Sequence, residues 1–399
     1  MLAKTPLLLT ALASPLFAQT VIVVDDDPGP GVDHTNLQLA IDAAAPGSTL
    51  LVKDGTYAAA LVNGKSLVIT GEAGGDVTIQ SGIVVRDLGP TDTVTLRELD
   101  VYGRQPMILL ANEGLVWIEN CELFEDSQGH PILPAAALHI VYCDRVVVRD
   151  TRVRAGHAIT GNHPAVHGMI AAWSSVYVYE FTAYGSPGYC THFSFADPGD
   201  GAFLYDATLF ASNSTFQGGI MAGAKFCMNE IGGAGIRLDG VSPGSQAFLS
   251  NSAGIGGAGD LLNLNGPDID TVLGSVQTHT EPVREFEVAS PIRADQSAQL
   301  TFRGEIGDQI LVMYGLRPSA LYLPLFFDAL HLPLPVNSFY AGQIDFTGER
   351  TISLDPDLPP GVESMTVYVQ PIFFTSSLFE DPTYDFSLPT SVVVVDPSF

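Results

Sequence analysis

Six of the nine histidines in this 399-residue chain lie between residues 130 and 192, together with four arginines. The histidines are His130, His139, His157, His163, His167 and His192, and the arginines are Arg145, Arg149, Arg152 and Arg154. Their acidic neighbours in the sequence are Asp144 and Asp150, so this segment is locally basic in a chain of net charge −27. Imidazole and guanidinium groups bind anions, and an imidazole also transfers protons near neutral pH.

The first interpretation of this segment is a binding surface for an anionic or neutral glycan, such as a polysaccharide or a cell-surface glycan. Charged groups and aromatic rings would both contact the sugar. The predicted contacts are His139, Arg149, Arg152, Arg154, His163, His167, Trp173 and Tyr177. A simpler alternative, without a binding site, is that these polar residues only lie on the outer faces of a structural protein.

The second interpretation is the active site of a polysaccharide lyase or glycoside hydrolase. A lyase needs a base that removes the proton beside a carboxylate, and a cation that neutralises that carboxylate. The catalytic candidates are His139, His167, His192, Arg149 and Arg152, and the candidates for a calcium site are Asp197 and Asp200. A hydrolase needs two carboxylates roughly 5 to 10 Å apart, and the sequence does not place such a pair.

A repeated eight-residue pattern in the sequence indicates which elements hold these candidate residues. Apolar residues occupy its first, third, sixth and eighth positions, and a polar residue occupies the fifth. Copies begin at Val94, Val116, Val146, Val176 and Ala202, with weaker copies at Leu67, Phe226 and Ala247. The fifth positions of the clear copies are Glu98, Asn120, Asp150, Glu180 and Asp206. Successive copies start 21 to 30 residues apart, a period typical of stacked-repeat proteins.

The pattern predicts two short strands that meet at a bend, because apolar residues alternate on both sides of the polar position. A further short apolar stretch precedes most copies, so each repeat supplies three strands and forms one coil of a β-helix. Leu204 would then join Leu96, Ile118, Val148 and Val178 in one interior row. His139 should point outward, with His167 and His192 at similar places one and two coils later. Such side chains would lie about 5 Å apart.

The two ends of the chain differ from the repeats. Residues 1–18 read as a secretory signal peptide, with Lys4 before an apolar stretch that is too short to span a membrane. Thr35 and Gln38 match a capping box for a helix over 37–45 that would cover the open end of the solenoid. Residues 19–284 form the predicted β-helix, and residues 285–399 form a predicted antiparallel β-sandwich that caps the last coil.

Ala40–Tyr57 and Gly64–Gly71 resemble the opening of pectin-lyase-like right-handed parallel β-helix proteins. The resemblance covers roughly residues 20–280 and implies a secreted β-helix. It implies no particular activity, because esterases, lyases and non-enzymes share this opening. Tyr57 is followed by three alanines where pectinesterase-like members usually carry a glutamate, and the catalytic segments of those esterases are missing here.

The composition limits the classes of partner that the protein is expected to bind and indicates where it is located. Seventeen basic against 44 acidic residues disfavour nucleic acids and anionic membranes, since phosphate binding needs clustered Lys and Arg. No segment after the signal is apolar and long enough for membrane insertion. We therefore expect an exported protein that is secreted or held at the cell surface. Of the four cysteines, Cys121 should pack inward as a small apolar residue, and at most one disulfide is expected. Calcium is the one cofactor that the sequence suggests. Glycine-rich segments at 232–235 and 256–259 should be structural turns.

Overall fold

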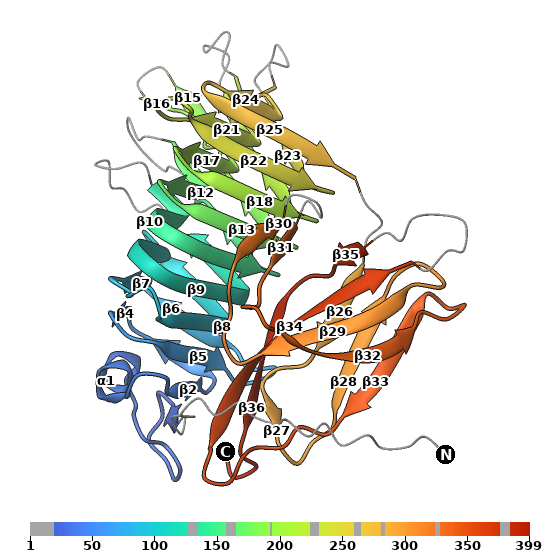
Figure 1. The fold of residues 1–399 in the computed structure, drawn as a ribbon. Helices are drawn as coiled ribbons and strands as arrows, with labels where there is room; N and C mark the ends of the chain where they lie inside the picture. The colour runs from blue at the N-terminus through green and yellow to red at the C-terminus, as the bar shows by residue number, and fades with distance from the viewer. Residues whose placement is uncertain are drawn as a thin grey trace.

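A computed structural model describes residues 20–126, 135–156, 165–191, 194–223, 231–258, 265–280, 284–323, 328–375 and 384–399. Twenty-two strands of the N-terminal two thirds stack in parallel coils (Figure 1). The predicted parallel β-helix is confirmed, and its connections take the right-handed path that parallel crossovers almost always follow. Each coil contributes one segment to each of three sheets, which we call the first, second and third sheets in chain order. No helix in the described part of the chain has the length and hydropathy needed to span a membrane.

The three sheets have the following strands. The first sheet holds β4 (Ala60–Asn63), β7 (Ile83–Arg86), the starts of β9 (Met107–Glu125) and β10 (Ala135–Arg149), β12 (Val166–Ala172), β17 (Ala202–Tyr205), β21 (Ile236–Asp239) and β24 (Ile269–Thr271). The second holds β1 (Val21–Val24), β2 (Thr49–Val52), β5 (Leu67–Gly71), the start of β8 (Thr93–Gly103), the middle of β9, the end of β10, β13 (Ser175–Tyr179), β18 (Thr208–Ser212), β22 (Ser245–Ser250) and β25 (Gly274–His279). The third holds β3 (Gly55–Tyr57), β6 (Val77–Gln80), the ends of β8 and β9, β11 (Arg152–Arg154), β14 (Thr182–Tyr184), β19 (Thr215–Gln217) and β23 (Ala253–Ile255).

The polar fifth position of the repeat is the corner between the second and third sheets. Its residues take left-handed backbone angles, with φ between 42° and 52° at Glu98, Asn120, Asp150 and Glu180. The prediction that Asp206 occupies this corner is wrong. Tyr179 aligns with Ser212, so the next corner residue is Asn213, and Ala211 replaces Leu204 in the interior row. Asp206 instead belongs to the corner between the first and second sheets, because the strand before it pairs with β12 and the strand after it pairs with β13.

The corner between the third and first sheets is built from glycine backbones. The Gly199 N–H donates to the Ser186 carbonyl over 2.8 Å, Gly219 to Gly199 over 2.7 Å, and Gly233 to Gly219 over 2.9 Å. A Cβ added to Gly199 would collide with the carbonyl oxygen of Val166. The predicted structural role of the glycine-rich segments is therefore confirmed, and these backbones lie too close together for side chains. Between these contacts the chain leaves the coils, partly as a small sheet of β15 (Gly188–Thr191), β16 (Ser194–Ala196) and β20 (Met221–Gly223).

The helix α1 (Leu37–Ala43) covers the first coil, as predicted, with Leu37, Ala40 and Ile41 buried. Its N-cap is Asn36, not Thr35, because the Asn36 side chain accepts from the Leu39 N–H over 3.0 Å. Gln38 has a different task from the predicted capping box. Its side chain accepts from the Leu61 N–H and donates to the Leu61 carbonyl of β4, and it thereby pairs an exposed strand edge.

The C-terminal region forms two further sheets packed face to face. One holds β26 (Glu285–Val288), β28 (Ala298–Arg303) and β33 (Glu349–Leu354). The other holds β27 (Ile292–Arg293), β36 (Thr390–Val395), β34 (Ser364–Phe374), β29 (Gln309–Gly315), β32 (Asn337–Gln343) and β35 (Tyr384–Phe386). β30 (Leu321–Leu323) and β31 (Asp328–Leu330) form a separate pair. Phe286, Phe302 and Phe373 are fully buried in the core between the sheets.

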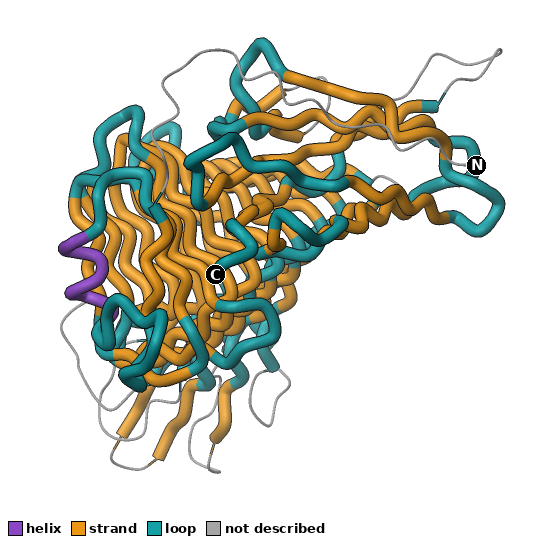
Figure 2. Tube along the Cα trace, turned by 90° about the horizontal axis from the view of Figure 1, so that it is seen from below, coloured by secondary structure: helices purple, strands orange, loops and turns teal. Residues whose placement is uncertain are grey.

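This domain does not cap the last coil, which corrects the predicted arrangement. Figures 1 and 2 show it beside the stack, along the second sheet. Trp117, Val147 and Tyr177 of that sheet pack against Leu330 and Tyr368 of the C-terminal domain. The reason is compositional: several outward positions of the second sheet are large and apolar, so they need a covering layer.

Candidate functional site

The structure divides the predicted site residues among three places. His139, His167, Trp173 and Asp200 lie on or beside the first sheet. Arg149 and Tyr177 lie beneath the C-terminal domain, and Arg152 and Arg154 lie on the third sheet. His163 and His192 fall outside the described residues. The predicted basic patch is therefore wrong as a single surface, because a β-helix turns consecutive strands toward different faces.

Arg149 and Tyr177 are unavailable to a ligand, which corrects their prediction as binding residues. Tyr177 is 5% exposed and packs among the aromatic residues of the domain interface. Arg149 donates to Glu119 Oε1 over 3.0 Å and to the Phe286 carbonyl over 2.8 Å. Both side chains serve the contact between the two domains.

Arg152 and Arg154 point from β11 toward carboxylates. Arg152 lines an open cavity of about 270 Å³ together with Asp100, Glu122 and Glu180. Burial raises the pKa of Asp100, and the neighbouring Glu122 raises it further. Arg154 lies 4.0 Å from Glu122. These arginines are balanced by acidic groups, so their surface does not attract anions as the sequence suggested.

His139 and His167 remain near one another on the first sheet, although not in the predicted register. His139 aligns with Ile170, and His167 aligns with Ala136. Burial lowers the pKa of His139, and the proximity of His167 lowers it further. His139 is therefore a neutral imidazole at neutral pH.

His167 is held by a buried carboxylate on the next coil. Its Nδ1 lies 3.2 Å from Oδ2 of Asp200, which is 1% exposed, and accepts from the Asp200 N–H over 3.1 Å. The imidazole also stacks on Phe203 at a ring-centre distance of 5.3 Å. Asp200 Oδ1 accepts from the Ala234 N–H over 2.8 Å. These contacts fix the orientation of the ring and leave Nδ1 as a hydrogen-bond acceptor.

Arg237 extends this cluster toward solvent. Its Nε lies 3.3 Å from Asp200 Oδ2 and 3.3 Å from Asp270 Oδ2, and its side chain is 40% exposed. Asp200 Oδ2 has no well-aligned donor, so the carboxylate is held by charge more than by hydrogen bonds. We refer to His139, His167, Asp200 and Arg237 as the polar cluster.

Asp200 thus has Arg237 and His167 beside it where the sequence suggested calcium. Among the described residues, no group of three or more His, Cys, Asp or Glu side chains is arranged to hold a metal ion. Asp197 is exposed.

An aromatic ridge follows the opposite end of the same strands. Tyr142 and Trp173 occupy the corner between the first and second sheets, where φ is 53° and 48°. Their rings stack at 4.8 Å with an interplanar angle of 11°, and Tyr205 meets Trp173 edge-on at 5.1 Å. Tyr142 is 54% and Trp173 is 46% exposed. His167 and Trp173 are six residues apart on extended backbone, so these two residues are roughly 20 Å apart along the sheet.

Sequence reasoning identified Trp173 but missed Tyr142, Tyr205, Arg237 and Glu125. Tyr142 had a usable signal, because it precedes Trp173 by about one coil length. Glu125 had none. Its side chain lies at the end of a third-sheet strand, where it accepts from the Gly156 N–H over 3.0 Å. Burial raises its pKa to about 7, which makes it a proton donor near neutral pH.

The two cysteines whose side chains are described do not form a disulfide. Cys121 and Cys143 are buried free thiols, and burial raises the pKa of Cys121 to about 12. The predicted inward packing of Cys121 is confirmed.

Comparison with known proteins found no matching family model and no matching curated protein. Among solved structures, the enzymatically active domain of tailspike protein 2 from bacteriophage CBA120 is 10% identical; the alignment covers 93% of this chain and 71% of that one, with a TM-score of 0.28. A pectin methylesterase from Aspergillus niger is 11% identical over 70% of this chain and 88% of that one, with a TM-score of 0.23. At these scores the likenesses add nothing on activity. The parallel β-helix fold stands on the strand register of this chain.

Proposed function

We propose that this protein binds a glycan along the outer face of the first sheet and acts outside the cell. The aromatic ridge carries this proposal. Rings that are about half exposed and fixed by stacking present rigid apolar surface, which is unusual on a soluble protein unless it contacts a partner. The polar cluster at the other end of the strands supplies hydrogen-bonding groups. The site is therefore long, as a chain-like ligand requires.

The chain offers a direct optical test, because it contains two tryptophans. Trp117 is fully buried in the domain interface, whereas Trp173 is 46% exposed. We expect that titration with the correct polysaccharide shifts the emission of Trp173 and protects it from acrylamide quenching. A panel of neutral and acidic polysaccharides in affinity gels identifies the ligand.

Replacing Trp173 with Ala should weaken binding to that polysaccharide by roughly 10- to 100-fold, because one large apolar contact is lost. Phe346→Ala is the matched control, since Phe346 is 85% exposed on the C-terminal domain. Equal retardation of the Trp173→Ala variant and the wild type would place the ligand elsewhere.

A second function, cleavage of a uronic-acid glycan by elimination, is favoured by the geometry of His167. Because Nδ1 accepts from the Asp200 N–H, the neutral ring of His167 carries its proton on Nε2 and can donate it to the leaving oxygen. The neutral imidazole of His139 beside it takes the proton next to the substrate carboxylate. The electron pair of that C–H bond forms the C4–C5 double bond. The C4–O bond breaks, its electron pair goes to the leaving oxygen, and that oxygen takes the proton of His167 Nε2 and departs as a hydroxyl group. Arg237 is placed to neutralise the substrate carboxylate.

This second function predicts unsaturated products, which absorb in the near ultraviolet, when the purified protein is mixed with polyuronates. His167→Gln should lower the rate at least about 100-fold, with little change in binding. Asp200→Asn should lower the rate and alter its pH profile, since Asp200 only positions the acid His167. His34→Gln, far from the cluster, is the control. Wild-type protein that retains glycans but forms no such product is a binding protein.

A further inference from the structure

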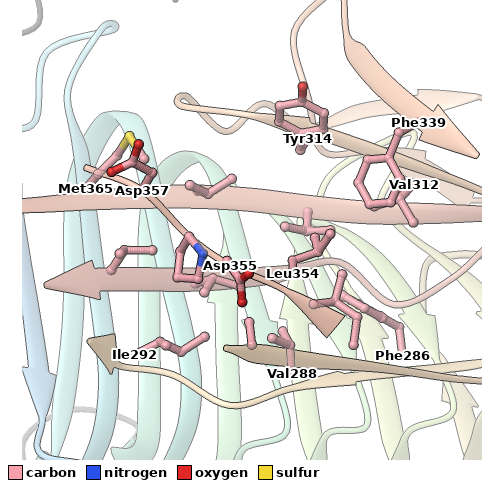
Figure 3. Close-up of a pocket in the computed structure, with 17 residues that line it drawn as sticks. Phe286, Val288, Ile292, Val312, Tyr314, Phe339, Leu354, Asp355, Asp357 and Met365 are labelled. Atoms are coloured by element: carbon pink, nitrogen blue, oxygen red, sulfur yellow. The ribbon is translucent and has the colours of Figure 1, made fainter. Parts of the chain in front are cut away.

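The C-terminal domain contains an apolar cavity between its two sheets, distant in the chain from the glycan surface. Its volume is about 100 Å³. Figure 3 shows Phe286 and Val288 on one side and Val312, Tyr314 and Phe339 on the other. Protein interiors contain few voids larger than a water molecule, so an opening of this size in a sandwich core is unusual.

Small side chains leave this space unfilled. Ala298 and six valines line it, including Val312 and Val392, at positions where one leucine would fill much of the volume. Its wall is almost entirely carbon, and water is therefore a poor occupant because it would find few hydrogen-bonding partners. A dry apolar cavity of roughly 150 Å³ is known to bind benzene. The cavity here suits an apolar group about as large as benzene or slightly smaller.

The cavity reaches the surface beside two carboxylates. Asp355 and Asp357 line it, flank Pro356 and are both exposed. The Ser297 hydroxyl donates to Asp355, and Leu354, just before this segment, is half-buried in the cavity wall. A ligand that enters here places its apolar part among valines and its head beside two negative charges. Charge complementarity then selects a positive head over a negative one.

We propose that the C-terminal sandwich binds small hydrophobic cations, in which an aryl or short alkyl group fills the cavity and an amine lies beside Asp355 and Asp357. The site is independent of the proposed glycan surface. It gives the C-terminal domain a binding role of its own, in addition to covering the second sheet.

Benzylamine, benzyl alcohol and benzoate test this directly, since they share one ring and carry a positive, a neutral and a negative head. Isothermal titration and thermal unfolding of the full chain should rank them in that order. Saturating benzylamine should raise Tm by about 2 to 4 °C. Failure of all three to bind would overturn the proposal, and equal binding of all three would overturn its selection of cations.

Two variants separate the cavity from its entrance. Asp355→Asn combined with Asp357→Asn should remove the preference for benzylamine and leave benzyl alcohol binding unchanged. Ala298→Leu should abolish binding of both, and its own Tm should not fall, because the added carbons fill existing space. Binding that survives Ala298→Leu in a folded protein would place the ligand outside the cavity. Retention of the glycan by the same variant keeps this test separate from the first function.

Discussion

Replacing Glu119 with Ala is expected to lower the free energy of unfolding by about 3 to 5 kcal/mol, because it leaves two buried arginines without their shared partner. Glu119 lies in the second sheet and is 2% exposed. Its Oε2 is 2.9 Å from Arg97 Nη1, and its Oε1 is 3.0 Å from Arg149 Nη1. It also accepts from the Ser391 N–H over 2.9 Å and from the Thr390 hydroxyl, both on β36.

The charge state of Glu119 shows the balance of these forces. Burial alone would raise the pKa of its carboxyl group, but Arg97 and Arg149, together with the hydrogen bonds from Ser391 and Thr390, outweigh burial and lower the pKa to about 2. The carboxylate therefore stays charged in the folded protein, and it joins the two domains by hydrogen bonds that solvent does not reach.

Chemical denaturation of Glu119→Ala, followed by circular dichroism, measures this effect. Glu122→Ala is the matched control, because Glu122 lies three residues along the same strand, is 38% exposed in its side chain and lies 4.0 Å from the surface arginine Arg154. Its cost should stay within about 0.5 kcal/mol. Similar losses for both variants would show that the buried pair does not hold the domains together.

Acidification from pH 6.5 to pH 3 should destabilise the domain interface by an amount on the order of 5 kcal/mol through His331 alone. His331 is 1% exposed and lies edge-on to Trp117 and Tyr177. Its Nε2 is 2.6 Å from the Tyr179 hydroxyl, and its Nδ1 is 3.2 Å from the Ser319 carbonyl. Burial lowers the pKa of this imidazole to about 3.

The sign of this pH effect on stability follows from which state of the chain, folded or unfolded, binds the proton. Between pH 6.5 and pH 3 the unfolded chain carries a proton on His331 that the folded chain does not. The stability that His331 contributes is therefore complete above pH 6.5 and is lost as the pH falls toward 3. Glu125 acts in the opposite direction, because its folded pKa of about 7 makes the folded protein bind the extra proton.

Comparison of the wild type with His331→Phe isolates the effect, since Glu125 is common to both. Thermal unfolding across this pH range should give a shallower dependence for the variant, whose ring keeps its packing but has no titrating group. Parallel pH profiles for the two proteins would contradict the assignment.

The sequence predicted the solenoid well, because its main determinant is local. Val116, Ile118, Cys121 and Leu123 repeat one inward and outward pattern that any β-helix must show, and the left-handed corner at Asn120 follows from the same eight residues. The register error at Asp206 arose because two corners carry similar residues, and only backbone pairing distinguishes them.

The candidate site was harder to predict, because its contacts are tertiary. Arg149 and Arg152 are three residues apart, yet a corner at Asp150 sends one beneath the C-terminal domain and the other to the third sheet. Nothing in the spacing of the repeats shows that a second domain covers the outward face of the second sheet. Asp200 and Arg237 are separated by a whole coil, so their meeting becomes visible only when the coils are stacked.

The glycine-built corner between the third and first sheets has a consequence for how the sequence of such a protein can evolve. Between Ser186 and Gly199, and again between Gly219 and Gly233, the path of the coil is closed by main-chain hydrogen bonds, which do not depend on the side chains of the intervening segment. Segments inserted, lengthened or exchanged at this corner leave the next coil in register. The coils can therefore stay the same while the sequence of the surface segments beside the polar cluster changes, as happens in the variable loops of a binding scaffold.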